Sequence, residues 1–132
     1  FVECYEDISE IFSLNNKANV ISKIESLKGI KFILENRGYL NLMAARDDLF
    51  VNSDSSYEMI DYLKKIISVD KNAVCASRIF SSLCSSGKFS LGDFEDLELM
   101  YLFGYRNFML QDDVKGDVLK LALKGFSDFK NG

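Results

Sequence analysis

Short apolar segments with strand character alternate with amphipathic helical segments along the whole chain. Such alternation predicts parallel strands joined by right-handed crossovers, and therefore an α/β fold of about five strand–helix units. No linker interrupts the order, so residues 1–132 are expected to form a single domain. The expected strands cover residues 1–4, 19–23, 40–45, 73–76 and 107–110.

The helical segments are recognised by the spacing of their apolar residues. The strongest is 57–68, where Met59, Ile60, Leu63 and Ile67 recur at i, i+3 and i+4 positions, as on the buried face of a helix. Gly104 follows another helical segment and is the residue type that commonly ends a helix. The expected helices cover residues 5–14, 27–36, 57–68, 78–84, 91–103 and 114–129.

Four of the expected strands end in polar or charged residues. In a fold of repeated strand–helix units, the carboxyl ends of the strands meet at one rim, and binding sites are built there. The sequence therefore predicts a site at this rim. The residues concerned are Lys23 and Glu25, Asp47 and Asp48, Ser77 and Arg78, and Asp112 and Asp113.

Composition excludes several classes of function. The net charge is −4 and no basic run interleaves with aromatic residues, so no nucleic-acid partner is expected. No apolar stretch reaches the roughly 20 residues that a membrane span requires, and no signal peptide is recognised. There is no His, so acid–base or metal chemistry must use Lys, Asp, Glu, Ser or Tyr. The three cysteines are expected to be buried, reduced thiols, which favours a cytoplasmic location.

Two closures of the sheet agree with this pattern. Five parallel strands could form a complete open, doubly wound domain. Alternatively, they could be part of an eight-unit barrel, which normally takes about 250 residues. The chain starts without Met, and Phe1 and Val2 already resemble the inside of a strand, so we expect a fragment of a longer protein.

Five segments, in the same order, resemble the pyruvate kinase family. They are residues 1–8 (FVECYEDI), 21–29 (ISKIESLKG), 43–49 (MAARDDL), 74–79 (VCASRI) and the gap-free stretch 90–113. The resemblance implies the second half of a TIM-type barrel, strands four to eight, of the phosphoenolpyruvate/pyruvate superfamily. Strands one to three would lie in upstream sequence or in a partner chain.

The resemblance also implies an activity. In the family, one Glu and one Asp of these motifs hold a divalent metal, so Glu25 and Asp48 are the implied ligands of Mg²⁺ or Mn²⁺, which prefer carboxylate oxygens. The implied ligand is phosphoenolpyruvate or a small 2-oxo acid. The implied reaction is phosphoryl transfer or cleavage of a C–C bond through an enolate, with the metal acting as a Lewis acid.

Roles for the other rim residues are carried over in the same way. Lys23 would neutralise charge developing on the phosphoryl group or the enolate. Ser77 stands where a family Thr assists the proton step. The substrate carboxylate would bind to backbone amides in the segment formed by Ala45, Arg46, Asp47 and Asp48.

Several positions depart from the family pattern. Asp47 replaces a Gly next to the metal-binding Asp, where a second carboxylate repels a bound substrate carboxylate. Arg78 replaces a Gln, Glu3 replaces an Arg, and residues 89–91 and 111–113 have lost the family's Pro-Thr-Arg and Ser-Gly-Glu. These departures favour an alternative function, a non-catalytic pyruvate kinase-like scaffold or ligand-sensing domain used for assembly.

Simpler roles also remain open for the rim residues. Lys23 and Glu25 lie two apart on a strand, so they share a face and could form an ion pair. Asp48 and Ser77 could cap the segments that follow them, and Asp112 and Asp113 could be turn or first-turn helix residues. A third possibility is an independent α/β binding module. A barrel section would expose unpaired edges, so we expect it to depend on upstream strands or a partner chain.

Overall fold

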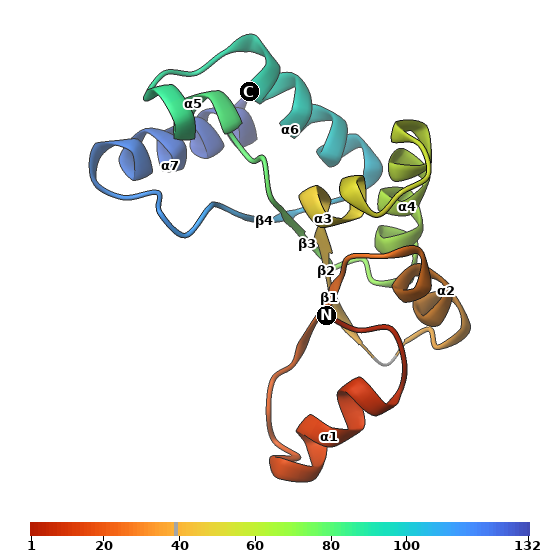
Figure 1. Ribbon diagram of the computed structural model, residues 1–132. Helices are drawn as coiled ribbons and strands as arrows, with labels where there is room; N and C mark the ends of the chain where they lie inside the picture. Colours follow the sequence, from red (N-terminus) through yellow and green to blue (C-terminus); the bar gives the residue numbers. More distant parts are fainter. Residues whose placement is uncertain (39) are drawn as a thin grey trace.

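Four parallel strands form one sheet in the order β1-β2-β3-β4 in a computed structural model, which describes residues 1–38 and 40–132 (Figure 1). The strands are β1 (Ile21–Ile24), β2 (Asn41–Ala45), β3 (Val74–Ala76) and β4 (Asn107–Met109). The α/β class and the parallel pairing are therefore confirmed. Consecutive strand order without a reversal is typical of a barrel section, whereas doubly wound sheets reverse their order. Closure into a TIM-type barrel stays a prediction.

The first of the five expected strands, residues 1–4, is not a strand in the structure. Val2 is buried and its N–H donates to the carbonyl of Lys23 at 3.0 Å, so the chain begins beside β1. The Asp7 carboxylate then accepts from the N–H groups of Glu3 (2.8 Å) and Cys4 (3.1 Å). These bonds direct the chain into the first helix, so residues 1–4 make no second hydrogen bond of the strand type with β1.

Seven helices connect and follow the strands in the described residues. Four of the six expected helices start one to three residues away from the expected position, and one helix was not expected. Residues 46–51 form a short helix directly after β2, and the helix expected from residue 78 begins at residue 81. The bounds are α1 (Glu6–Leu14), α2 (Leu27–Glu35), α3 (Arg46–Val51), α4 (Ser56–Val69), α5 (Ser81–Ser86), α6 (Leu91–Phe103) and α7 (Gly116–Asn131).

The late start of α5 has a backbone cause. Ser77, Arg78 and Phe80 have φ values of 67°, 59° and 52°, in the left-handed region, where a right-handed helix cannot form. The interpretation of Ser77 as a helix cap is therefore wrong, because the residue preceding α5 is Phe80. Gly104 does end α6, with a φ of 112°. Asp112 and Asp113 lie in a turn ahead of α7.

The core lies between the sheet and helices α2, α4 and α6. Right-handed crossovers between neighbouring strands place successive helices on the same face of a sheet. Every second strand residue points into this layer and packs against residues of the three helices. The residues on both sides of the layer are almost fully buried. They include Ile24, Leu42, Ala44 and Cys75 from the strands, Ile30 and Ile33 from α2, Leu63 and Ile66 from α4, and Leu97 and Met100 from α6.

The opposite face of the sheet is only partly covered. Lys23, Met43 and Val74 pair side by side across β1, β2 and β3, and all three are half-buried. Within the described residues, β4 pairs with β3 alone, so its outer edge has no strand beside it. Parallel sheets are normally covered on both faces, so both features leave room for further protein.

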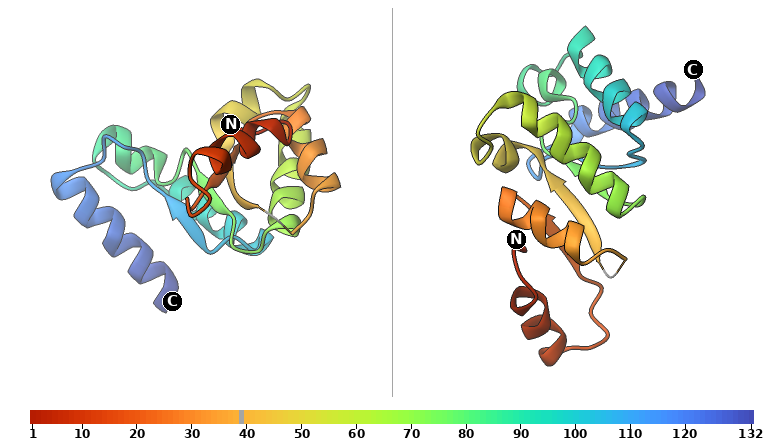
Figure 2. Two further views of the ribbon diagram at one scale, coloured as in Figure 1. Left: turned by 90° about the horizontal axis from the view of Figure 1, so that it is seen from below. Right: turned by 90° about the vertical axis from the view of Figure 1, so that its right-hand side faces the viewer.

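The rim and α1 lie at opposite ends of the molecule. Helices α3 and α5 follow the carboxyl ends of β2 and β3, whereas α1 projects from the other end (Figures 1 and 2). Of the cysteines, Cys75 is buried in β3, while Cys4 and Cys84 are half-buried, and all three are free. No helix among the described residues combines the length and apolarity needed to cross a membrane.

Candidate functional site

Three of the predicted site residues meet at the rim. Lys23 Nζ contacts Glu25 Oε1 and donates to Asp48 Oδ2 at 3.1 Å. Lys23 belongs to β1, Glu25 follows that strand directly, and Asp48 lies in the first turn of α3. The ion pair between Lys23 and Glu25 that the sequence allowed is thus present. It is extended by a carboxylate from 25 residues downstream.

The cluster of Lys23, Glu25 and Asp48 is partly open to solvent. Their side chains are 44%, 21% and 48% exposed, so a ligand can reach them. Hydrogen bonding to Glu25 and then to Asp48 raises the pKa of the Lys23 ammonium above its ordinary value. Lys23 therefore carries its positive charge throughout the physiological pH range. The carbonyl of Glu25 also accepts from Asn52 Nδ2 at 3.1 Å, which ties the end of β1 to the end of α3.

The donor set of this cluster suits a hard divalent cation with an open coordination sphere. Glu25 and Asp48 both reach the same ammonium, so their oxygens converge. Among the described residues, no group of three or more His, Cys, Asp or Glu side chains is placed to hold a metal. Mg²⁺ is commonly held by one or two carboxylates, with water and substrate supplying the remaining oxygens. The protein would thus contribute two ligand groups.

Asp48 does not act as a helix cap. The residue preceding α3 is Ala45, and no side-chain capping bond forms there. Ala45 itself is fully buried at the end of β2. Arg46, Asp47 and Asp48 make up the first turn of α3, where N–H groups have no partner within the helix. That they bind a substrate carboxylate stays a prediction.

The Arg46 side chain turns away from the rim and pairs with Asp96. This pair is called the Arg46–Asp96 clamp below. The Arg46 side chain is 3% exposed. Its Nη1 and Nη2 donate to Asp96 Oδ1 (2.7 Å) and Oδ2 (2.9 Å), and its Nε donates to the carbonyl of Ser77 at 2.9 Å. One guanidinium thus joins the ends of β2 and β3 to α6. Two-pronged pairing of this kind is among the stronger interactions available to arginine.

The clamp holds the strained turn that follows β3. Non-glycine residues with positive φ are uncommon, and several in succession store backbone strain. Ser77 and Arg78 are consecutive residues of this kind, Phe80 is a third one two positions later, and the Ser77 carbonyl is fixed by Arg46. The role of the Ser77 hydroxyl in a proton step stays a prediction.

Asp47 and Arg78 form an ion pair next to the cluster. Arg78 Nε donates to Asp47 Oδ1, and Arg78 Cζ lies 5.4 Å from the centroid of the Phe50 ring. The side chains of Asp47 and Arg78 are 49% and 56% exposed. The carboxylate of Asp47 is therefore balanced by the guanidinium of Arg78.

Sequence reasoning missed one carboxylate that shapes this region. Asp93 is 4% exposed and accepts from the N–H groups of Ser82 (2.8 Å), Leu83 (3.2 Å) and Ser90 (3.0 Å). It therefore caps the beginnings of both α5 and α6. The signal for it was the Ser-x-x-Asp spacing of Ser90 and Asp93, which resembles a capping box.

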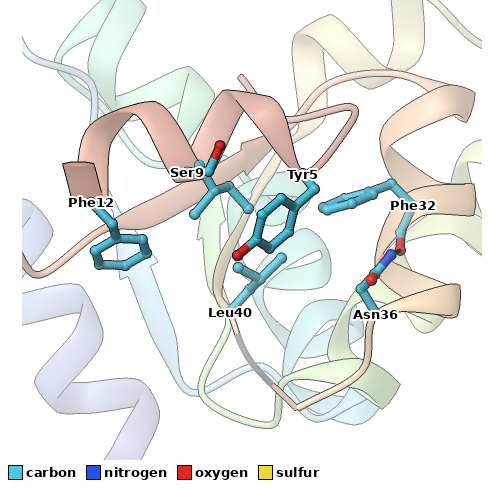
Figure 3. Close-up of a pocket in the computed structure, with 7 residues that line it drawn as sticks. Tyr5, Ser9, Phe12, Phe32, Asn36 and Leu40 are labelled. Atoms are coloured by element: carbon cyan, nitrogen blue, oxygen red, sulfur yellow. Dashed lines mark hydrogen bonds between the residues drawn. The ribbon is translucent and has the colours of Figure 1, made fainter. Parts of the chain in front are cut away.

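A cavity lies away from the rim. It has a volume of about 510 Å³ between α1, the end of α2 and the start of β2 (Figure 3). Aromatic and aliphatic side chains line most of it, and no charged side chain does. The lining residues are Tyr5, Ile8, Ser9, Phe12, Phe32, Asn36 and Leu40.

Comparisons with known proteins leave the family open. The chain matches no protein-family model, and a search of curated proteins found no matching sequence. The rim cluster therefore rests on its own geometry.

Proposed function

We propose that the chain is part of a pyruvate kinase-like barrel whose rim binds a divalent metal together with phosphoenolpyruvate or the enolate of a 2-oxo acid. The observation that supports this most directly is the convergence of Lys23, Glu25 and Asp48. The resemblance assigns a role to each of these three residues independently. The half-covered face and the open outer edge of β4 fit a barrel completed by upstream strands or a partner chain.

Each residue of the cluster has a chemical task in this proposal. Glu25 and Asp48 bind the metal, Mg²⁺ or Mn²⁺, which when bound polarises the substrate oxygens as a Lewis acid. Lys23 places its ammonium beside the oxygen on which negative charge develops. An ammonium has three N–H donors, and the partners of Nζ among the described residues are Glu25 and Asp48. One donor is thus left for the ligand.

Mn²⁺ binding to the purified protein, measured by the electron paramagnetic resonance of free Mn²⁺, tests the proposal. We expect oxalate, a mimic of the enolate, to strengthen Mn²⁺ binding in the wild-type protein. Glu25→Gln and Asp48→Asn should each weaken that binding by about tenfold or more, because each removes a charged ligand. Asp61→Asn is the matched control, since Asp61 pairs with Lys65 on α4 away from the rim. Binding that is the same in all four proteins would refute the metal site.

The second candidate is a non-catalytic scaffold or ligand-sensing domain. It is favoured by the completeness of the ion pairs, because Lys23 and Arg78 both have carboxylate partners in this structure. In that case the rim charges stabilise the loops. The same experiment separates the scaffold from the proposed site, because a scaffold shows no oxalate-dependent gain in Mn²⁺ affinity. A ligand-sensing domain that keeps the metal site differs from an enzyme only in lacking turnover.

A further inference from the structure

The Arg78 guanidinium presents a free edge at the rim. Its Nε donates to Asp47, and no partner for Nη1 or Nη2 is found in the part of the chain that the structure describes. These two nitrogens form a fork that matches the two oxygens of a carboxylate. The side chain is 56% exposed, so the fork is open to solvent.

The position of Arg78 is held by buried interactions. Its own φ is 59°, and the preceding residue, Ser77, has a φ of 67°. The Ser77 carbonyl accepts from the buried Arg46, which is held in turn by both oxygens of Asp96. Residues kept in such backbone conformations tend to lie at ligand sites, where the surrounding structure offsets the strain. The clamp therefore presents one arginine to the rim.

We propose that Arg78 binds a carboxylate of the ligand that lies away from the metal, so that the ligand is a 2-oxo dicarboxylate, and that the Arg46–Asp96 clamp positions Arg78 for this contact. This inference rests on the proposed function, because it assumes that the other end of the ligand binds at Lys23, Glu25 and Asp48. Arg78 is a specificity residue in this arrangement. Arg46 and Asp96 act through it.

The net charge at the rim favours a dicarboxylate over phosphoenolpyruvate, whereas the preference for a second carboxylate over an uncharged end rests on the Arg78 fork. Glu25, Asp47 and Asp48 oppose Lys23 and Arg78, which leaves one negative charge in excess. A divalent metal reverses this to one positive charge. A bound 2-oxo dicarboxylate carries two negative charges, so the site with metal and ligand then has one negative charge in excess. Fully ionised phosphoenolpyruvate carries three negative charges and leaves two negative charges in excess. The smaller imbalance costs less when charges lie close together.

The test compares two ligands that differ only in their far end. 2-Oxoglutarate and 2-oxopentanoate have the same chain length, and only 2-oxoglutarate carries a second carboxylate. Their dissociation constants are measured by calorimetry in the presence of Mn²⁺. We expect the wild-type protein to bind 2-oxoglutarate about tenfold more tightly, as a charge-assisted hydrogen bond allows. The ratio should fall to about one in Arg78→Gln and to an intermediate value in Arg78→Lys, which lacks the fork.

Arg37→Gln is the matched control. Arg37 follows α2, at the opposite end of the strands, so the ratio should keep its wild-type value. A wild-type ratio near one, with the oxalate effect on Mn²⁺ intact, would overturn this inference and leave the proposed function standing. A ratio unchanged by Arg78→Gln would also overturn it. Loss of the oxalate effect itself would overturn both.

The positioning role has its own readout. Asp96 touches no ligand in this arrangement, so Asp96→Asn should change the ligand ratio only through the clamp. We expect the ratio in Asp96→Asn to approach that of Arg78→Gln, and Asp96→Glu to restore part of it. Circular dichroism identifies a variant that has not folded, and in that event Asp96→Glu decides the question. A folded clamp variant with the wild-type ratio would show that Arg78 needs no positioning.

Discussion

Asp47 and Arg78 form an ion pair between the carboxyl ends of β2 and β3, 31 residues apart in the chain. Asp47 alone would add a carboxylate beside Asp48, and Arg78 alone would add an unbalanced cation. Because the two charges cancel, the pair leaves the net charge of the rim the same as a smaller, uncharged pair of residues would.

The interaction between Asp47 and Arg78 should contribute little to the free energy of unfolding. Both side chains are about half exposed, and ion pairs in contact with water contribute at most about 1 kcal/mol. A double-mutant cycle with Asp47→Asn and Arg78→Gln, followed by urea unfolding, measures the coupling. We expect less than about 1 kcal/mol, and a smaller value in 1 M salt. A coupling above about 2 kcal/mol would mean that the pair is shielded from water.

The Arg46–Asp96 clamp should matter far more for stability. Arg46→Met removes a buried cation and leaves the Asp96 carboxylate and the Ser77 carbonyl without their partner. Because Arg46 is buried but Asp96 is 33% exposed, the loss should cost about 1–3 kcal/mol of unfolding free energy, mostly from the groups left without a partner. Arg37→Met, at an exposed site, should change stability by no more than about 0.5 kcal/mol. Equal urea midpoints for the two variants would contradict the clamp.

Gly29 should not tolerate alanine although it lies in a helix. A Cβ at Gly29 would lie 2.8 Å from the carbonyl oxygen of Val2, so α2 and the first residues would have to separate. We expect Gly29→Ala to destabilise the protein by about 1–3 kcal/mol. Hydrogen exchange at the Val2 amide should also become faster, because its bond to Lys23 weakens.

Gly92 is the matched control for Gly29, because it also lies in a helix. The nearest atom to a Cβ at Gly92 is Ser90 Oγ at 3.6 Å, an ordinary contact. Gly92→Ala should therefore stabilise the protein by up to about 1 kcal/mol through helix propensity alone. If Gly29→Ala is equally stabilising, Val2 is not packed against α2.

Alkaline pH should destabilise the protein through Cys75. Burial raises the pKa of the Cys75 thiol from 9.0 to about 11. The unfolded chain therefore loses this proton first, and stability that is complete below pH 9 declines as the pH rises towards 11. Two pH units correspond to about 2–3 kcal/mol. Urea unfolding at pH 8 and pH 10.5 should show a smaller decline in Cys75→Ala. A decline equal to that of the wild type would assign it to other groups.

Local patterns in the sequence were sufficient to predict most of the secondary structure. The apolar spacing of α4 and the glycine that ends α6 depend on neighbouring residues only, and both were placed correctly. The alternation of strands and helices also predicted the parallel pairing, because a crossover helix returns the chain to the same end of the sheet. The strand predicted for residues 1–4 was wrong, because the Asp7 carboxylate accepts hydrogen bonds from backbone N–H groups in this segment.

The residue types at the strand ends predicted a rim site, and the tertiary structure decided which of them meet. Lys23, Glu25 and Asp48 converge because β1 and β2 are neighbours in register. The pairing of Arg46 with Asp96, 50 residues away, and of Asp47 with Arg78 depends on how α3, α6 and the turn after β3 pack together. The spacing of apolar residues within a helix or strand can be seen in the sequence itself. Contacts between distant charged residues arise only when packing brings their segments to the same rim.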